Sequence, residues 1–381
     1  MKTMYQSLIA GIPTEKAPVK PVRSDSTVKP PKQKGLLAIV KRTEPRPSFV
    51  YDTYWRFAEK RQAIYHRRVR DEAGPWSDDP VLQTYKFTNA YRASDRVSQY
   101  LIKNVIYSGT HGLESSVLRT LLFKIFNKIE TWKLLEHAFG EISVRTFEPA
   151  TFGAVLERAM ASGASIYSAA YIMPSGPADI RRARKHEMHL ELLRTLLLEG
   201  FPAKLARCGS MRAAYELFRT VPGVGPFLAY QFVTDLNYSP HFSFTELEFV
   251  MPGPGARDGL RKCFEDFGGY SEAEVIQWVT ERQTTEFRKR GLPFNSLWGR
   301  DLQLIDCQNL FCEVDKYSRV VHPEAMGLTG RTRIKQKFSA SVAQMPTPWF
   351  PPKWGINERI SETTKLARHE RTSEISFLHP A

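Results

Sequence analysis

Polar residues crowd one junction in the chain, the stretch FTNAYRASDRVSQYL that begins at Phe87. Arginine can clamp phosphate oxygens with its planar fork, and the amides of asparagine and glutamine can read a pyrimidine edge. Steps of three and four residues from Arg92 would place four of these residues on one helical face. We predict a substrate site here; the alternative is an ion pair between residues three apart on a solvent-exposed surface. The residues are Asp95, as a catalytic carboxylate, and Asn89, Arg92, Arg96 and Gln99, as substrate-binding residues.

A second candidate for acid–base chemistry is the pair Glu246 and Glu248, which flank Leu247. In an extended segment the two carboxylates would share one face, so that one could orient an amine while the other removes its proton. Either could equally be a helix-start carboxylate or an exposed charge.

A third candidate is the polar stripe in LIDCQNLFCEVDKYSR, where Asp306, Asn309, Glu313 and Lys316 recur at helical spacing. Such a stripe is usually a solvated face.

Glycine-rich turns supply candidate phosphate contacts. The segment TVPGVGPFLAYQFVTDL predicts a helix, a tight turn and a second helix that starts at Pro226. Glycine lets a backbone approach a phosphate closely, and the first N–H groups of a helix point at it. The segment MPGPGARDGL is a second such loop, and RRARK is a basic helix start. The predicted DNA-binding residues are Gly223, Val224, Gly225, Gly253, Gly255, Arg181 and Arg182, against the alternatives of plain turns and a solvated charge run.

Helices are the elements that must position these groups. In DRVSQYLIKNVI the apolar residues recur every three or four positions, and strand-like alternation is sparse throughout. We therefore predict a mostly α fold in three parts. They are a basic Pro- and Lys-rich arm over 1–49, a helical catalytic domain over 50–322 and an extended tail over 323–381.

Composition narrows the range of partners. The chain of 381 residues has 54 Lys and Arg against 40 Asp and Glu, a formal charge of +14 that favours a polyanion such as DNA. The four cysteines lack CxxC spacing and the histidines lack ligand spacing, so we expect reduced thiols, no metal and no cofactor. The sequence contains no long apolar run, so we expect no membrane span. We expect a monomer in the cytoplasm, that of the host if the protein is phage-encoded.

Several of these motifs carry a family resemblance. The VPGVG hairpin resembles that of the helix-hairpin-helix DNA glycosylases, with Glu246 and Glu248 where that superfamily has its catalytic Asp. The stretches 56–107, 249–260 and 304–319 resemble the α-glutamyl/putrescinyl-thymine pyrophosphorylases of DNA hypermodification, also called amino acid:DNA transferases. The form FTNAYRxxDRVSQYLI is shared with the helical domain attached to 5-hydroxymethyluracil DNA kinases.

The resemblance implies a glycosylase-like helical fold and a reaction on a flipped base in double-stranded DNA. In that reaction an amine from an amino acid or a polyamine replaces the pyrophosphate of 5-(pyrophosphomethyl)-deoxyuridine. The resemblance also covers most of LIDCQNLFCEVDKYSR, and it implies that Asp306, as a catalytic residue, and Lys316 face the pocket and that Asn309 binds substrate. Lys316 and Arg319 are then candidates for contact with the pyrophosphate. The sequence contains no GxxxxGK[ST] P-loop, so kinase activity is not expected. The alternatives are a base-excision glycosylase, a non-catalytic DNA-binding module, and a helical subunit that works with a kinase.

Overall fold

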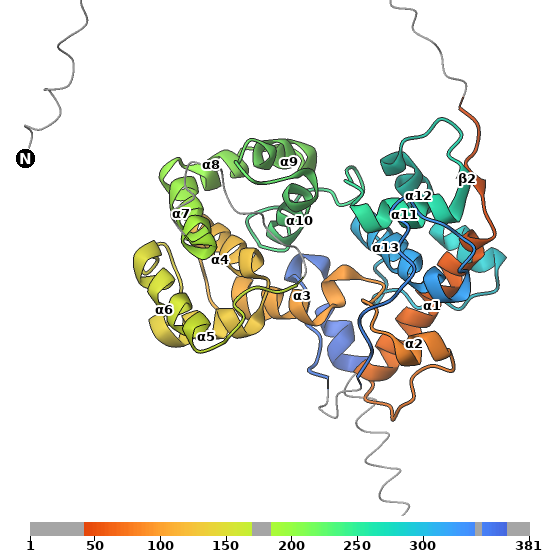
Figure 1. The fold of residues 1–381 in the computed structure, drawn as a ribbon, viewed down its shortest axis with the longest axis horizontal. Coiled ribbons are helices and arrows are strands. Elements are labelled where there is room, and N and C mark those ends of the chain that lie inside the picture. The colour runs from red at the N-terminus through yellow and green to blue at the C-terminus, as the bar shows by residue number, and fades with distance from the viewer. Residues whose placement is uncertain (1–41, 170–183, 340–344, 364–381) are drawn as a thin grey trace, which may run out of the picture. The chain divides into compact units, whose positions relative to one another are not determined.

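The computed structural model describes residues 42–169, 184–339 and 345–363, and this part of the chain is mostly helical, as predicted (Figure 1). The only regular strands within it are β1 (Arg46–Pro47) and β2 (Phe264–Asp266), which pair antiparallel. The helices are α1 (Val50–Val69), α2 (Pro80–Thr84), η1 (Arg92–Ser94), α3 (Arg96–Tyr100), η2 (Leu101–Ile106), α4 (Leu113–Phe126), α5 (Ile129–Phe139), α6 (Pro149–Ala161), α7 (Lys185–Leu198), α8 (Phe201–Ala206), α9 (Met211–Arg219), α10 (Pro226–Leu236), α11 (Pro254–Cys263), α12 (Glu272–Lys289), α13 (Leu304–Val321) and η4 (Pro352–Trp354).

The predicted helical hairpin is present as α9 and α10, which lie next to each other in Figure 1. Ser210 caps α9 by accepting a hydrogen bond from the Ala213 N–H at 3.1 Å. Gly223 turns the chain between the helices with φ +79°, a conformation that a residue with a Cβ rarely adopts. Pro226 then starts α10, where its missing N–H costs nothing.

The helix predicted for DRVSQYLIKNVI forms, but in two geometries. α3 supplies its first turn, and residues 101–106 continue as a π-helix, η2. The Tyr107 N–H accordingly donates to the carbonyl of Ile102, five residues back, at 3.1 Å. π-Helical insertions are rare and often lie at functional sites.

The helices α11 and α13 pack against each other most closely of the described pairs. An ideal Cβ on Gly259 of α11 would overlap the Phe311 carbonyl of α13, so only glycine fits at this contact. Apolar side chains such as Leu260, Leu310 and Val314 fill the space around it and are almost completely buried.

The described residues of the C-terminal segment pack onto the helical body. Phe350, Ile356 and Ile360 are at most 3% exposed. The segment is extended over most of its described length, but it contains η4 and ends in a helix over 357–363. No helix in the described ranges is long and apolar enough to cross a membrane, and no group of Asp, Glu, His or Cys there could hold a metal ion.

Candidate functional site

A buried charge cluster surrounds Arg92. Its guanidinium donates to both carboxylate oxygens of Asp235 on α10, at 2.6 and 3.1 Å. The Lys124 ammonium on α4 lies 3.2 Å from the same carboxylate, and all three side chains are at most 4% exposed. Burial by itself would raise the pKa of Asp235, but Arg92 and Lys124 outweigh it and hold the pKa below its usual range. The cluster carries two cations for one anion.

Asp235 and Lys124 are functional candidates that the sequence analysis missed. Each is a charged residue inside an apolar helix, PFLAYQFVTDL for α10 and LESSVLRTLLFKIF for α4. A charge on the buried side of a helix needs a partner there, and this signal could have identified both residues.

Asp306 links the backbone at Arg92 to the start of α13. Its carboxylate accepts hydrogen bonds from the backbone N–H of Arg92 at 2.8 Å and of Gln303 at 3.0 Å. Burial raises the pKa of Asp306 to about 6, against the lowering effect of these two hydrogen bonds. The predicted carboxylate is thus a buried anchor between two backbone segments.

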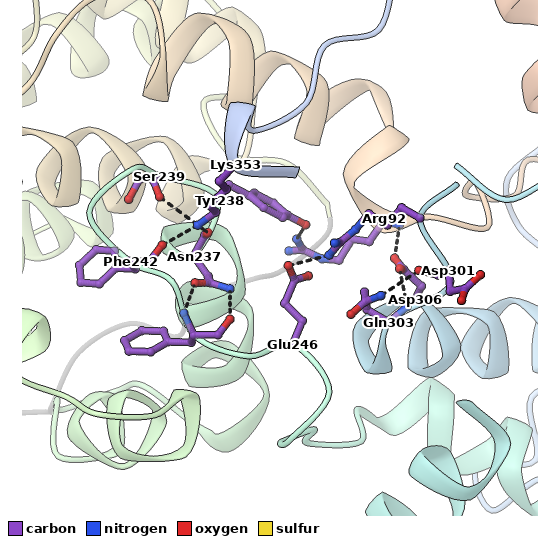
Figure 2. Close-up of polar contacts among 12 residues, drawn as sticks. Arg92, Asn237, Tyr238, Ser239, Phe242, Glu246, Asp301, Gln303, Asp306 and Lys353 are labelled. Atoms are coloured by element: carbon purple, nitrogen blue, oxygen red, sulfur yellow. Dashed lines mark hydrogen bonds and ion pairs between the residues drawn. The ribbon is translucent and has the colours of Figure 1, made fainter. Parts of the chain in front are cut away.

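Glu246 and Arg300 form an ion pair beside this anchor, with 2.7 Å between Oε1 and a guanidinium nitrogen. The Arg300 guanidinium also lies 3.9 Å from the ring centroid of Trp354, a close cation–π contact. Arg300 and Trp354 both line a cavity of about 630 Å³, whose walls also include Gln303 and Arg359. Figure 2 shows Glu246 between the end of α10 and Asp306. The pair therefore places a cation in the wall of this cavity, with the Glu246 carboxylate directly beside that cation.

Lys353 ties the C-terminal segment to this site (Figure 2). Its ammonium donates to three backbone carbonyls just after α10, those of Asn237, Ser239 and Phe242. Burial lowers the pKa of Lys353 to about 8, although the nearby Glu246 carboxylate works against this shift. The sequence-based prediction also missed Lys353, Trp354 and Arg300. The aromatic run Trp-Phe-Pro-Pro-Lys-Trp could have identified Lys353 and Trp354 as candidates.

The prediction that Arg92, Asp95, Arg96 and Gln99 share one helical face is wrong. The chain is a 3₁₀ turn at Arg92 and extended at Asp95, so helical spacing does not apply across this stretch. Arg92 points to Asp235, Arg96 is exposed, and Gln99 donates to the Ala93 carbonyl.

Asp95 instead holds the loop that precedes it. Its carboxylate accepts from the Asn89 N–H at 2.9 Å, and the Asn89 side chain donates to the Ser94 carbonyl and accepts from Arg61. Loss of water contact raises the pKa of Asp95 to about 7, and the nearby Glu313 carboxylate adds to this rise.

The extended segment that would give Glu246 and Glu248 a shared face is not formed. Residues 246–248 form a turn and a bend instead of an extended segment. The Glu248 carboxylate accepts from the Met211 N–H at 3.1 Å and so lies at the N-terminus of α9. Of the two carboxylates, Glu246 alone reaches Arg300.

The polar stripe of α13 lies on one side of the helix, as predicted, but it is mostly buried instead of solvated. Asn309 donates to the Thr88 hydroxyl at 3.0 Å, and Glu313 accepts from the Thr88 N–H at 2.9 Å. The Lys316 ammonium pairs with Glu313 at 2.8 Å. Arg319 pairs with Asp315 and donates to the Arg333 carbonyl. The cations proposed for pyrophosphate are therefore occupied by protein partners.

The predicted DNA-binding residues fall into three places. Gly223, Val224 and Gly225 form the turn before α10, where Gly223 is exposed and Val224 is buried. Gly253 and Gly255 lie at the start of α11. Arg181 and Arg182 lie outside the described residues.

The family model for the helical domain of 5-hmdU DNA kinases matches residues 48–327, well over half of the chain. The chain belongs to this family. A curated 5-hmdU DNA kinase from Bacillus phage SP10 is 28% identical over 286 residues, which is 70% of this chain and 45% of the kinase. The chain thus spans less than half the length of that relative. No solved structure matches the chain.

Proposed function

We propose that this chain acts in the hypermodification of thymine in DNA, by replacing the pyrophosphate of 5-(pyrophosphomethyl)-deoxyuridine with an amine. Its similarity to a 5-hmdU DNA kinase supports DNA with a 5-modified thymine as the substrate class. The observation that carries the proposal is the Glu246–Arg300 pair at the edge of the 630 Å³ cavity. It combines a proton acceptor with a cation suited to a phosphate leaving group.

The proposed step is a substitution at the 5-methylene carbon. Glu246 takes a proton from the incoming ammonium, and the amine nitrogen then forms a bond to the methylene with its lone pair. The carbon–oxygen bond to the pyrophosphate breaks, and its electron pair leaves on the pyrophosphate oxygen beside Arg300. Asp306 and Trp354 are positioning residues, because they hold the start of α13 and the guanidinium plane of Arg300.

DNA would reach this site through the hairpin. The exposed turn at Gly223 and the start of α10 offer backbone N–H groups to a DNA phosphate, and the formal charge of +14 favours that contact. A base buried in the duplex stack would have to flip out to enter the cavity. The protein would bind DNA as a monomer, one chain per modified base.

The test is incubation with duplex DNA carrying 5-(pyrophosphomethyl)-deoxyuridine and a mixture of amino acids and polyamines, followed by nucleoside mass analysis. We expect an amine adduct and free pyrophosphate. Glu246→Gln should lower turnover at least about a hundredfold, the usual contribution of general base catalysis. Glu248→Gln is the matched control, since that carboxylate lies at α9, and it should keep turnover. Equal activity in both variants would refute the role of Glu246, and free base with abasic sites would indicate a glycosylase.

The comparisons favour a second candidate, a DNA-holding module for a kinase. The match to the helical domain, over less than half of the relative, supports a part that presents 5-hmdU DNA to a kinase catalytic domain. In this case the chain would bind 5-hmdU DNA tightly and leave the pyrophosphomethyl nucleotide unchanged.

A further inference from the structure

A second, smaller cavity lies where α10 and α11 begin. It measures about 90 Å³ and is lined by residues from four motifs that lie far apart in the sequence, among them Arg92, Phe227, Gly255 and Asn309. Both helices start with a Gly-Pro pair and neither has a side-chain cap. The first N–H groups of a helix have no partner within the helix and carry the positive end of its dipole.

Close packing brings the two helix starts together. An ideal Cβ on Gly253, the N-cap of α11, would lie 2.7 Å from the Phe227 ring of α10. A Cβ on Gly255 would overlap the Cys312 sulfur. Glycine at both positions therefore lets the helix starts approach Phe227 and α13, and it leaves the backbone of α11 exposed to the cavity.

The electrostatic environment of this cavity favours an anion. No Asp or Glu is among its lining residues, which include the Arg92 side chain. Arg92 forms an ion pair with Asp235, and its guanidinium still lines the cavity and contributes positive potential there.

The Gln308 amide points to a missing ligand. Gln308 lines the cavity and is 5% exposed, and its Oε1 has no hydrogen-bond partner among the described residues. A buried polar group without a partner costs free energy, so such groups are usually completed by a ligand or water. An amide carries both donors and an acceptor, so it can turn an N–H toward an oxyanion.

We propose that this cavity is a phosphate site, built from the first turns of α10 and α11 and from the amide of Gln308. Its volume equals that of about three water molecules, enough for one phosphate group. The phosphate can come from the DNA backbone or from a free phosphate compound, and both share the same chemistry. This proposal does not depend on the substitution reaction at Glu246.

The experiment measures binding of inorganic phosphate and pyrophosphate to the full chain by ³¹P NMR titration, without DNA or turnover. Gln308→Glu puts a negative charge in the cavity at nearly constant shape and should weaken phosphate binding about tenfold or more. The control is Gln83→Glu, since Gln83 is exposed, bonds the Ser77 carbonyl and lines neither of the two cavities. Gln308→Leu should also lose binding while its thermal stability stays equal or rises, because it removes an unpaired acceptor.

A second arm identifies the source of the phosphate. Affinity for unmodified duplex DNA is measured at several salt concentrations for the wild type, Gln308→Glu and the control Gln83→Glu. The source is a backbone phosphate if Gln308→Glu alone binds DNA more weakly and shows a smaller salt dependence. The slope of log affinity against log salt concentration should then be smaller by about one. Unchanged DNA binding with lost phosphate or pyrophosphate binding would identify a free anion. Gln308→Glu behaving as wild type in both arms would overturn the proposal, whatever the outcome of the turnover assay.

Discussion

The buried cluster of Arg92, Lys124 and Asp235 leads to a sharp prediction about stability. Asp235→Asn removes the only anion of the cluster and leaves two cations that are at most 4% exposed. It also replaces one of the two carboxylate oxygens that accept from Arg92 with an NH₂ group, so at least one of these hydrogen bonds is lost, and it weakens the contact with Lys124. Removal of one partner from a buried ion pair costs about 3–5 kcal/mol, and we expect this range for Asp235→Asn.

Lys124→Met is the matched change, because it leaves one cation and one anion. It gives up the contact with Asp235 and the hydrogen bond to Asn127 at 2.9 Å, but it also removes the unbalanced charge. We therefore expect a cost of about 1 kcal/mol or less, within the range of one net hydrogen bond. The double variant should be more stable than Asp235→Asn alone, since it buries one cation without the Asp235 carboxylate instead of two.

The assay is urea unfolding followed by circular dichroism, with the free energy of unfolding taken from the midpoint and slope of each curve. Equal losses in Asp235→Asn and Lys124→Met would refute the charge argument. A double variant less stable than Asp235→Asn would refute it as well, because the two side chains would then act through packing. If Asp235→Asn does not fold, recovery of folded protein by the added Lys124→Met tests the same reasoning.

Three further predictions concern single contacts. Gly259→Ala should lower the free energy of unfolding by about 1–3 kcal/mol, because its Cβ meets the carbonyl of Phe311. Gly209 has open space around it, so Gly209→Ala should change this free energy little, and urea unfolding curves compare the two variants. The pKa of Asp306 is raised in the folded chain to about 6, so the folded state binds more protons between about pH 4 and 6 and its stability should fall as pH rises through that window. Asp306→Asn should remove this part of the pH dependence, and an unchanged pH profile of the unfolding midpoint would contradict the assignment. Lys353→Met should leave three carbonyls without their donor and should lower turnover together with stability, as measured in the assays above.

The sequence predicted the helical class and the α9–α10 hairpin well, because local signals determine them. Apolar spacing, a Ser N-cap and the Gly and Pro positions all act within a few residues. The polar stripe of α13 was also predicted, because helical spacing fixes which residues share a side.

The partners of the site residues could not be predicted in the same way. Arg92 contacts Asp235 across 143 residues, and Glu246 contacts Arg300 across 54. Such pairs depend on tertiary packing, which local spacing does not encode. The shared face at Arg92 failed for a local reason, since the chain leaves helical geometry at Asp95 before α3 begins. A spacing rule holds only inside one continuous helix.

The C-terminal segment has a practical consequence for protein engineering. The family match ends at residue 327, but Trp354, Ile356 and Arg359 wall the larger cavity, and Lys353 anchors the end of α10. A fragment trimmed at the homology boundary would keep every described helix through α13 and still lack part of the wall of this cavity. A loss of activity in such a fragment would then reflect the incomplete cavity wall. Conversely, exchange of residues 345–363 between relatives offers a way to reshape this cavity while the helical scaffold stays unchanged.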